Sequence, residues 1–130
     1  MIVVDTHIII WDALQPASLS DSARLALAEH QETGIIICDI SVWEIAMLMK
    51  KGRLKIDAHY QEFMALILQA NNYIVRQISP QIAEIAAGLP LDVNKDPADR
   101  LIAATAIAAN VPLVTADKNL RAADSITTIW

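Results

Sequence analysis

The chain has 130 residues, near the usual size of one domain, and we predict a single domain over residues 1–130. Hydrophobic residues make up 55% of the sequence and charged residues 19%, so the chain can bury a substantial core beneath a charged surface. The formal net charge of −5 excludes a strongly positive surface that would attract nucleic acid over its whole extent. A polyanionic substrate would therefore need local cations or a bound metal.

Cys38 is the only cysteine, which excludes a disulfide within the chain and favours a reducing, cytoplasmic location. The first residues carry no positive region and reach an acid at Asp5, so we expect a core strand there and no signal peptide. No run of 18 apolar residues exists, and we predict no membrane-spanning helix.

Short apolar runs alternate with helical patterns along the whole chain. The expected strands are 2–4, 35–38, 73–78, 113–115 and 126–129. The expected helices are 6–14, 20–32, 41–49, 58–70, one that begins at Ser79-Pro80, and one from Pro97 to about 109. Residues 89–96 have the composition of a loop. This alternation predicts a three-layer α/β/α fold with a central, mainly parallel sheet that is covered on both faces.

Four acids, Asp5, Glu44, Asp99 and Asp117, each follow a predicted strand or lie near the start of a predicted helix. Because ligands of parallel sheets bind beyond the carboxyl ends of the strands, we expect these acids to meet in one pocket. Packed carboxylates repel each other and resist ionisation unless a cation joins them. The four together predict a hydrolytic centre that binds Mg²⁺ or Mn²⁺.

Each acid also has a purely structural interpretation. Asp5 suits the N-cap of the next helix, and Thr6 is expected to orient its carboxylate through a hydroxyl hydrogen bond or to be the cap itself. Ser41-x-x-Glu44 matches a capping box, which is the favoured interpretation of Glu44 when it is taken alone.

The last two acids have similar alternatives. Asp96 is the expected cap of the helix that begins at Pro97, with a supporting or outer metal role as the minority interpretation. Asp99 would complement the dipole of that helix. Asp117 suits a cap for residues 118–123, and it shares a strand face with Thr115.

Several short segments together carry a resemblance to a known family. They are Asp5-Thr6-His7 after the first strand, Ser41-x-x-Glu44 in a helix followed by residues 51–54, the run 96–104, and Thr115-Ala116-Asp117. In order and spacing, over essentially the whole chain, they resemble the PIN-domain nucleases, in particular the VapC-type toxins of bacterial toxin–antitoxin pairs. The resemblance implies a PIN-like fold and endonucleolytic cleavage of RNA by a water that Mg²⁺ or Mn²⁺ activates. It also implies a homodimer that binds a cognate antitoxin protein.

The resemblance assigns the family's four acids to Asp5, Glu44, Asp99 and Asp117. Asp5, Asp99 and Asp117 are the expected metal ligands, with Asp117 binding directly or through water, and Glu44 is a ligand or orients the attacking water. The expected supporting residues are Thr6, Thr115 and Asp96.

Other side chains near these acids carry weaker expectations. Arg100 and Lys118 flank the acids in the sequence and are the expected phosphate contacts. Trp11 and Trp43 are expected to pack in the core, although aromatic residues also anchor protein interfaces. His7 lacks a spaced partner for a zinc site.

Three other functions are alternatives to a toxin nuclease. A phosphatase of the haloacid dehalogenase type would use Asp5 as a nucleophile, but it needs a second Asp two positions later, where this chain has His7. A housekeeping PIN nuclease would process RNA without toxicity. A binding module would keep the fold and lose activity, which the complete set of acids disfavours.

Overall fold

Five short strands form one sheet in which all neighbouring strands run parallel. The computed structural model describes all 130 residues. The strands are β1 (Ile2–Val4), β2 (Ile35–Cys38), β3 (Ile74–Arg76), β4 (Leu113–Val114) and β5 (Thr128–Ile129), in the order β3-β2-β1-β4-β5. The residues of β1, β2 and β4 are fully buried, as expected for a parallel sheet that is covered on both faces.

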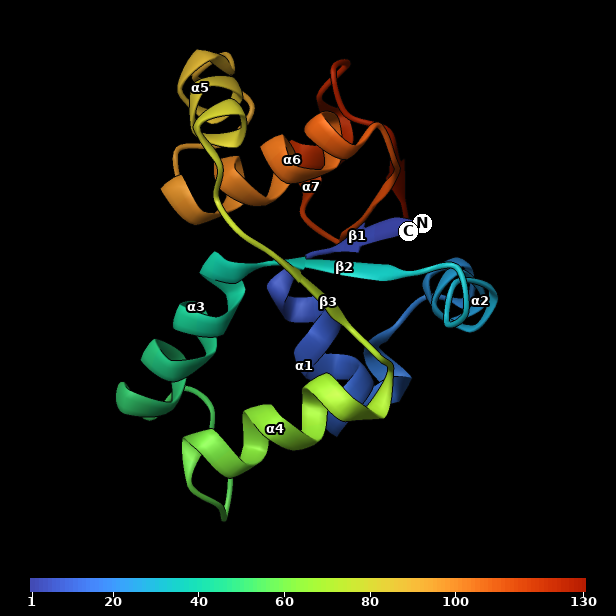
Figure 1. Cartoon of the computed structure of the whole chain (residues 1–130), viewed down its shortest axis with the longest axis vertical. Coiled ribbons are helices and arrows are strands. Elements are labelled where there is room, and N and C mark those ends of the chain that lie inside the picture. Colours follow the sequence, from blue (N-terminus) through green and yellow to red (C-terminus); the bar gives the residue numbers. More distant parts are fainter.

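Helices cover both faces of this sheet. They are α1 (Thr6–Leu14), α2 (Asp21–Glu29), α3 (Asp39–Lys50), α4 (Tyr60–Ala70), α5 (Pro80–Gly88), α6 (Pro97–Ala109) and α7 (Lys118–Ala122), with a short 3₁₀ turn, η1 (Pro16–Ser18). Figure 1 shows α1, α3 and α4 on one side of the sheet and α5, α6 and α7 on the other. The predicted three-layer α/β/α fold with a parallel sheet is confirmed. None of these helices is both long and apolar enough to cross a membrane.

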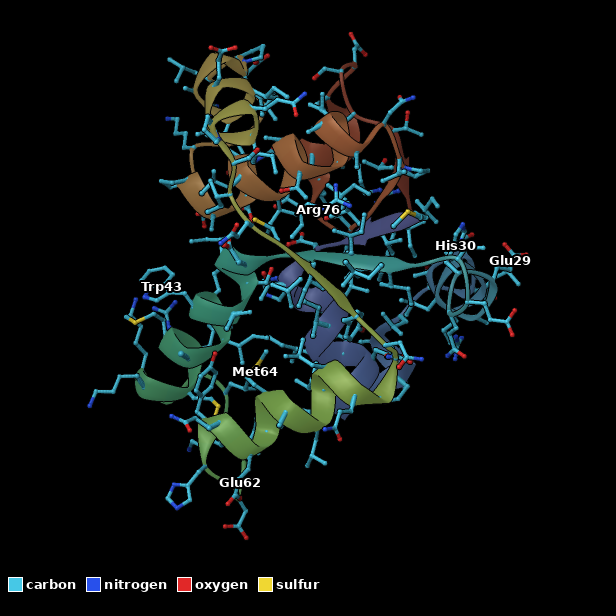
Figure 2. The ribbon with its side chains drawn as sticks, viewed as in Figure 1. Glu29, His30, Trp43, Glu62, Met64 and Arg76 are labelled. Carbon is cyan, nitrogen blue, oxygen red and sulfur yellow. The ribbon has the colours of Figure 1, made fainter.

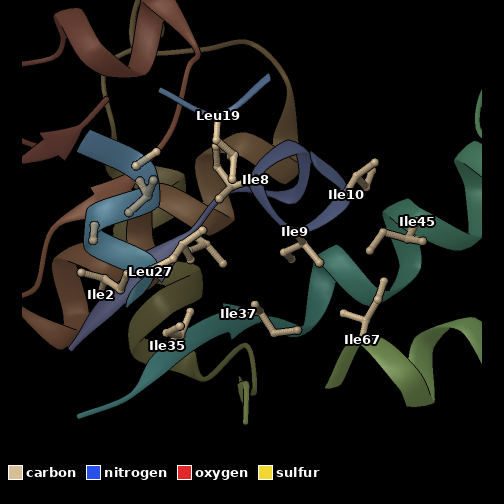
Figure 3. Packing of buried hydrophobic residues seen from close by; sticks show 14 of the residues in the cluster. Ile2, Ile8, Ile9, Ile10, Leu19, Leu27, Ile35, Ile37, Ile45 and Ile67 are labelled. Carbon is tan, nitrogen blue, oxygen red and sulfur yellow. The ribbon is translucent and has the colours of Figure 1, made fainter. Parts of the chain in front are cut away.

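The alternation of side chains along the two central strands divides the core between the two faces. In β1, Ile2 and Val4 belong to the cluster beneath α1, α2 and α4, whereas Val3 belongs to the cluster beneath α6. In β2, Ile35 and Ile37 face the first cluster, which Figure 3 shows from close by. Ile36 and Cys38 face the second cluster. Cys38 is therefore a buried packing residue, as its apolar neighbours in the sequence suggest.

Most helix boundaries follow from their capping residues. The Ser79 and Asp96 side chains cap α5 and α6, and each is followed by proline at the first helical position, as the sequence predicts. Asn110 ends α6 in the left-handed conformation, with φ of 53°. The helix predicted at 20–32 ends at Glu29, because the chain turns there toward Gly34, whose φ of 127° suits only glycine.

The two edge strands are shorter than the sequence predicts. The run 73–78 is paired only over Ile74–Arg76, and the run 126–129 only over Thr128–Ile129. Each edge strand has a neighbour on one side only, so its outer backbone groups gain nothing from a regular extended conformation. Ile74 and Val75 are also 40% and 44% exposed, so their burial contributes little to holding a longer strand.

The strand order places a natural binding position between β1 and β4. From β1 the chain proceeds outward to β2 and β3, and it then returns to place β4 and β5 on the opposite side of β1. At such a reversal, the connections after two neighbouring strands leave in opposite directions and open a crevice at the carboxyl edge. Asp5 directly follows β1, and Asp117 lies in the segment that follows β4.

Candidate active site

A single pocket at the carboxyl edge of the sheet gathers all four predicted acids. It has a volume of about 290 Å³. The residues that line it are Asp5, His7, Trp11, Glu44, Asp96, Asp99, Ala116 and Asp117. The expectation that the acids meet in one pocket is confirmed, and the catalytic role of each acid stays a prediction.

Asp5 is both the cap of α1 and the most deeply buried acid of the pocket, with 4% of its surface exposed. Its Oδ1 accepts a 2.7 Å hydrogen bond from the backbone N–H of Thr6, and its Oδ2 accepts one of 2.7 Å from the hydroxyl of Thr115. Burial raises the pKa of Asp5 although these two hydrogen bonds favour its ionised form. The carboxylate is therefore fixed in direction, and it forms no ion pair with a lysine or arginine.

The capping box predicted at Ser41 and Glu44 is wrong, because α3 begins two residues before Ser41. The helix starts at Asp39, and its N-cap, Cys38, makes no side-chain capping bond. Ser41 lies within the first turn and is fully buried. Its hydroxyl is 2.8 Å from the hydroxyl oxygen of Thr6 in α1 instead of bonding to the backbone of its own helix.

The Thr6 hydroxyl orients Glu44, whereas we expected it to orient Asp5. The Thr6 hydroxyl donates a 2.6 Å hydrogen bond to Glu44 Oε1. Since that hydroxyl carries a single hydrogen, the Ser41 hydroxyl must be the donor in the bond between Ser41 and Thr6. The relay from Ser41 through Thr6 to Glu44 joins α3 to α1, and burial raises the pKa of Glu44.

Asp96 is the N-cap of α6 and Asp99 lies in its first turn, where the helix dipole favours negative charge. Asp96 Oδ1 caps the helix by accepting from the backbone N–H of Ala98 at 2.9 Å, as predicted. Asp99 faces the other acids. Burial first, and then the negative charges of Asp5, Asp96, Asp117 and Glu44, raise the pKa of Asp99 to about 8. Without a cation, Asp99 therefore holds a proton at neutral pH.

Asp117 combines the capping role with a place in the pocket. Its Oδ1 accepts a 2.9 Å hydrogen bond from the backbone N–H of Leu120 in the first turn of α7. Its own backbone N–H donates to the Thr115 hydroxyl oxygen at 3.0 Å. Because that hydroxyl also donates to Asp5, Thr115 fixes the spacing between the two acids that follow β1 and β4.

Asn94 contacts two of the pocket acids and was not predicted from the sequence. Its Nδ2 lies 2.8 Å from Asp99 Oδ2 and 3.4 Å from Asp117 Oδ2, so one amide contacts both carboxylates. Asn94 lies in the loop between α5 and α6, where no periodicity or motif marks it. Its position two residues before the cap Asp96 was the only local signal that could have found it.

No lysine or arginine neutralises these acids. The one ion pair in the chain joins Arg24 and Asp21, which are exposed on α2. Lys118 is exposed beside Asp117, and its side chain forms no ion pair and no hydrogen bond within the protein. The pocket acids are thus compensated by hydrogen bonds and, for Asp5 and Glu44, by the nearby His7.

The prediction that Arg100 contacts phosphate is contradicted by its hydrogen bonds. All five N–H groups of its guanidinium donate to backbone carbonyls, which belong to Ala86, Leu89, Pro90 and Asn94. No donor remains for a phosphate. Arg100 instead ties the loop between α5 and α6 to the end of α5.

The two tryptophans near the acids have different surroundings. Trp11 lines the pocket, and its ring centroid lies 5.8 Å from those of His7 and Trp130. Trp43 is 57% exposed, so the expectation that it packs in the core is wrong. Figure 2 shows it projecting from α3 away from the sheet.

The donors in the pocket suit a hard divalent cation. Carboxylate oxygens are the ligands that Mg²⁺ and Mn²⁺ prefer, and His7, on the exposed rim, is the only nitrogen ligand that lines the pocket. As the side chains stand, no three of them close around one point at coordinating distance.

The fold and the pocket define an α/β protein whose acids converge at the switch point of a parallel sheet. Residues 2–126 match the family model for the PIN domain, and the chain therefore belongs to the PIN-domain family. The resemblance predicted from the sequence is confirmed.

The chain is also similar to a known ribonuclease and to solved structures. It is 33% identical to ribonuclease VapC22 of Mycobacterium tuberculosis over 120 residues, which cover 92% of this chain and 89% of that protein. Two structures share its fold at 20% identity and cover 98% of it. VapBC2 of Rickettsia felis bound to a promoter DNA fragment has a TM-score of 0.73, with 97% of that chain covered. FitAcB of Neisseria gonorrhoeae has a TM-score of 0.68, with 96% of that chain covered.

Proposed function

We propose that this chain is a divalent-metal-dependent endoribonuclease and the toxin of a toxin–antitoxin pair. The observation that carries the proposal is the pocket in which Asp5, Glu44, Asp99 and Asp117 converge without a cationic partner. The whole-chain similarity to a ribonuclease supports RNA as the substrate. Membership of the PIN family supports hydrolysis of a phosphodiester bond.

Asp5, Asp99 and Asp117 are the proposed ligands of a bound Mg²⁺ or Mn²⁺. The ion supplies positive charge for the phosphate and makes a nearby water more acidic. Asp5 is held by the backbone of Thr6 and the hydroxyl of Thr115, and each of its oxygens retains a lone pair for a ligand. Asp99 must lose its proton to bind, because only the ionised carboxylate is a good ligand.

Glu44 is the proposed residue that orients the attacking water and accepts its proton. Thr6 engages Oε1, and Oε2 makes no hydrogen bond within the protein, so Oε2 is available to a water molecule. The raised pKa makes Glu44 a stronger base than an exposed glutamate. This assignment needs no serine or cysteine nucleophile.

The surroundings of Asp5 disfavour the phosphatase alternative. A carboxylate nucleophile must reach the phosphorus atom, but Asp5 is 4% exposed and both of its oxygens accept hydrogen bonds. The position two residues later holds His7, which lies exposed on the rim of the pocket. A housekeeping nuclease would use the same pocket, and only a cellular experiment separates it from a toxin.

The proposed partners are a cognate antitoxin and a second copy of this chain. Structures that resemble this chain include a toxin–antitoxin complex from Klebsiella pneumoniae, with 23% identity and a TM-score of 0.67 over 98% of this chain and 97% of that one. Exposed apolar side chains such as Trp43 and Leu66, 57% and 66% exposed, offer surface that a partner would cover. Cytoplasmic action is part of the same proposal.

A cleavage assay tests the proposed activity. Wild type, Asp5→Asn and Asp99→Asn are incubated with a mixed RNA pool in Mg²⁺ or Mn²⁺, with an EDTA control. We expect cleavage only by the wild type with metal. If the wild type cleaves no RNA with either metal, or if the variants cleave it as fast as the wild type, the nuclease assignment is contradicted.

Induced expression tests the toxin role separately. We expect growth arrest with the wild type and none with Asp5→Asn, and relief of arrest when the neighbouring upstream reading frame is co-expressed. Harmless expression of a protein that cleaves RNA in the assay would favour the housekeeping nuclease.

A further inference from the structure

Trp11 is the one large apolar side chain among the residues that line the acid pocket. Ala116 is the other apolar residue there, and the remaining lining residues are the acids and His7. Trp11 and His7 lie one helical turn apart on α1, so they share the side of this helix that borders the pocket. The pocket therefore has an aromatic wall beside its acids.

Several contacts hold the Trp11 ring in place. Its centroid lies 5.8 Å from that of His7, at an interplanar angle of 52°, and 5.8 Å from that of Trp130, at 44°. These distances are in the range of attractive aromatic pairs. Trp11 also packs against the core cluster that contains Ile8 and Ile9. A side chain held in this way loses little conformational entropy when a ligand packs against it.

The aromatic wall suits the uncharged part of an RNA strand. No lysine or arginine lines the pocket, and the net charge of the chain is −5, so the protein offers the RNA backbone little electrostatic attraction. A bound cation would neutralise a phosphate at the acids. Further affinity has to come from uncharged contacts. Stacking on an aromatic ring is such a contact, and it is open to any base because every base has a π face.

The size of the pocket allows one nucleotide to contact both the acids and Trp11. The pocket volume of about 290 Å³ is close to the lower limit of about 300 Å³ for sites that bind small molecules. A nucleotide whose phosphate lies at the acids can therefore place its base against Trp11. Only an unpaired base can do so, because a paired base is stacked within its own helix.

We propose that Trp11 receives an unpaired base of the RNA next to the bond that is cleaved. This proposal rests on the proposed nuclease function and deepens it, because it adds a substrate contact that neither the acids nor a metal ion supplies. The contact exists before the reaction and persists through it. Loss of the indole should therefore raise KM for RNA more than it lowers kcat.

RNA binding measured in the Asp5→Asn background tests the base contact without cleavage. The probes are a short oligoadenylate and an abasic oligoribonucleotide of the same length, each with Mn²⁺. We expect about 10-fold weaker binding of oligoadenylate after Trp11→Leu, and about 3-fold weaker binding after Trp11→Phe, which keeps an aromatic ring. The abasic strand has no base to stack, so it should bind equally to each of these proteins.

Two controls separate the base contact from a structural role of the indole. Trp43→Leu makes the same change at a tryptophan that is 57% exposed on α3 and does not line the pocket, and it should leave the affinity for both probes unchanged. Trp11 also packs against the core, so melting curves check that each variant is folded. If Trp11→Leu does not fold, Trp11→Phe carries the comparison of the two probes and the measurement of KM and kcat.

The possible failures are distinguishable. Equal weakening for the oligoadenylate and the abasic strand would assign Trp11 a structural role only. Equal affinity of the Asp5→Asn protein for the two probes would show that the pocket takes no base. Either result, with a wild type that cleaves RNA, overturns the proposal and leaves the nuclease assignment intact. A wild type that neither binds nor cleaves RNA would overturn both.

Discussion

The hydroxyl of Thr115 donates to Asp5 across 110 positions of the sequence, at 2.7 Å. This bond joins the end of β4 to the end of β1 at the point where the strand order reverses. The same hydroxyl accepts from the backbone N–H of Asp117. The buried side chain of Thr115 thereby fixes the relative positions of Asp5, near the start of the chain, and Asp117, near its end.

Replacing Thr115 by valine should damage the pocket without changing its shape. The variant leaves Asp5 Oδ2 and the Asp117 N–H without their partner, which we expect to cost about 1–3 kcal/mol of unfolding free energy. The rate of RNA cleavage by Thr115→Val should also fall. Thr115→Ser keeps the hydroxyl and should retain activity, and urea unfolding with a cleavage assay compares the two. Equal behaviour of the Val and Ser variants would contradict the role of this bond.

Asp99→Asn should separate stability from activity. The asparagine side chain of this variant carries no charge, so its burial costs less and the other acids do not repel it. The metal-free variant should therefore melt at or above the wild-type temperature at pH 8. RNA cleavage should fall by roughly 10²-fold or more, since the variant lacks a proposed ligand of the metal. Asp57→Asn, which changes an exposed loop residue, should alter neither property.

The raised pKa of Asp99 predicts how the stability of the metal-free protein varies with pH. Asp99 binds a proton up to about pH 8 in the folded state, but only to about 3.8 when unfolded. Between these values the folded state holds more protons, so the stability that this group contributes is lost as the pH rises from about 3.8 to about 8. Melting temperatures should therefore decline over this window, and less steeply in Asp99→Asn.

Mn²⁺ should oppose that decline. Binding requires the ionised acid, so the ion should stabilise the protein more at the alkaline end of the window. Metal-induced stabilisation that is largest at low pH would contradict the assignment of Asp99 as a ligand.

Arg100→Lys should loosen the loop between α5 and α6. A lysine has three donors and cannot reproduce the five bonds that the guanidinium makes to four carbonyls. We expect a loss of about 1–3 kcal/mol in unfolding free energy and faster hydrogen exchange over residues 89–96. Arg121→Lys changes an exposed arginine on α7 and serves as the control. Hydrogen exchange over residues 89–96 as slow in Arg100→Lys as in the wild type would show that the Arg100 hydrogen bonds do not hold this loop.

Lys118 is the remaining predicted phosphate contact near the acids. Lys118→Met should weaken RNA binding and reduce the slope of log affinity against log salt by about one. Binding is measured with Asp5→Asn as background, so that cleavage does not interfere. Lys50→Met, at the far end of α3, is the matched control, and an equal effect of both changes would exclude a specific contact.

The fold could be predicted because its signals are local and independent. Apolar runs for the strands, and cap-plus-proline pairs at Ser79 and Asp96, mark the elements without knowledge of their neighbours. The meeting of the four acids followed from the rule that parallel strands share a carboxyl edge.

The errors concern side chains whose partners are distant. Ser41 matches a capping motif, but its partner is Thr6, 35 positions away. Arg100 flanks an acid in sequence, yet its guanidinium turns toward the end of α5. No sequence motif marks Asn94, because its hydrogen bonds depend on how the fold brings Asp99 and Asp117 together.

Diffraction from crystals soaked in Mn²⁺ tests the central claim most directly. The anomalous scattering of manganese locates the ion without assumptions about the protein. We predict a peak in the pocket within about 2.5 Å of carboxylate oxygens of Asp5 and Asp99. No peak there, or a peak only at other acids, in a protein that still cleaves RNA would contradict the account.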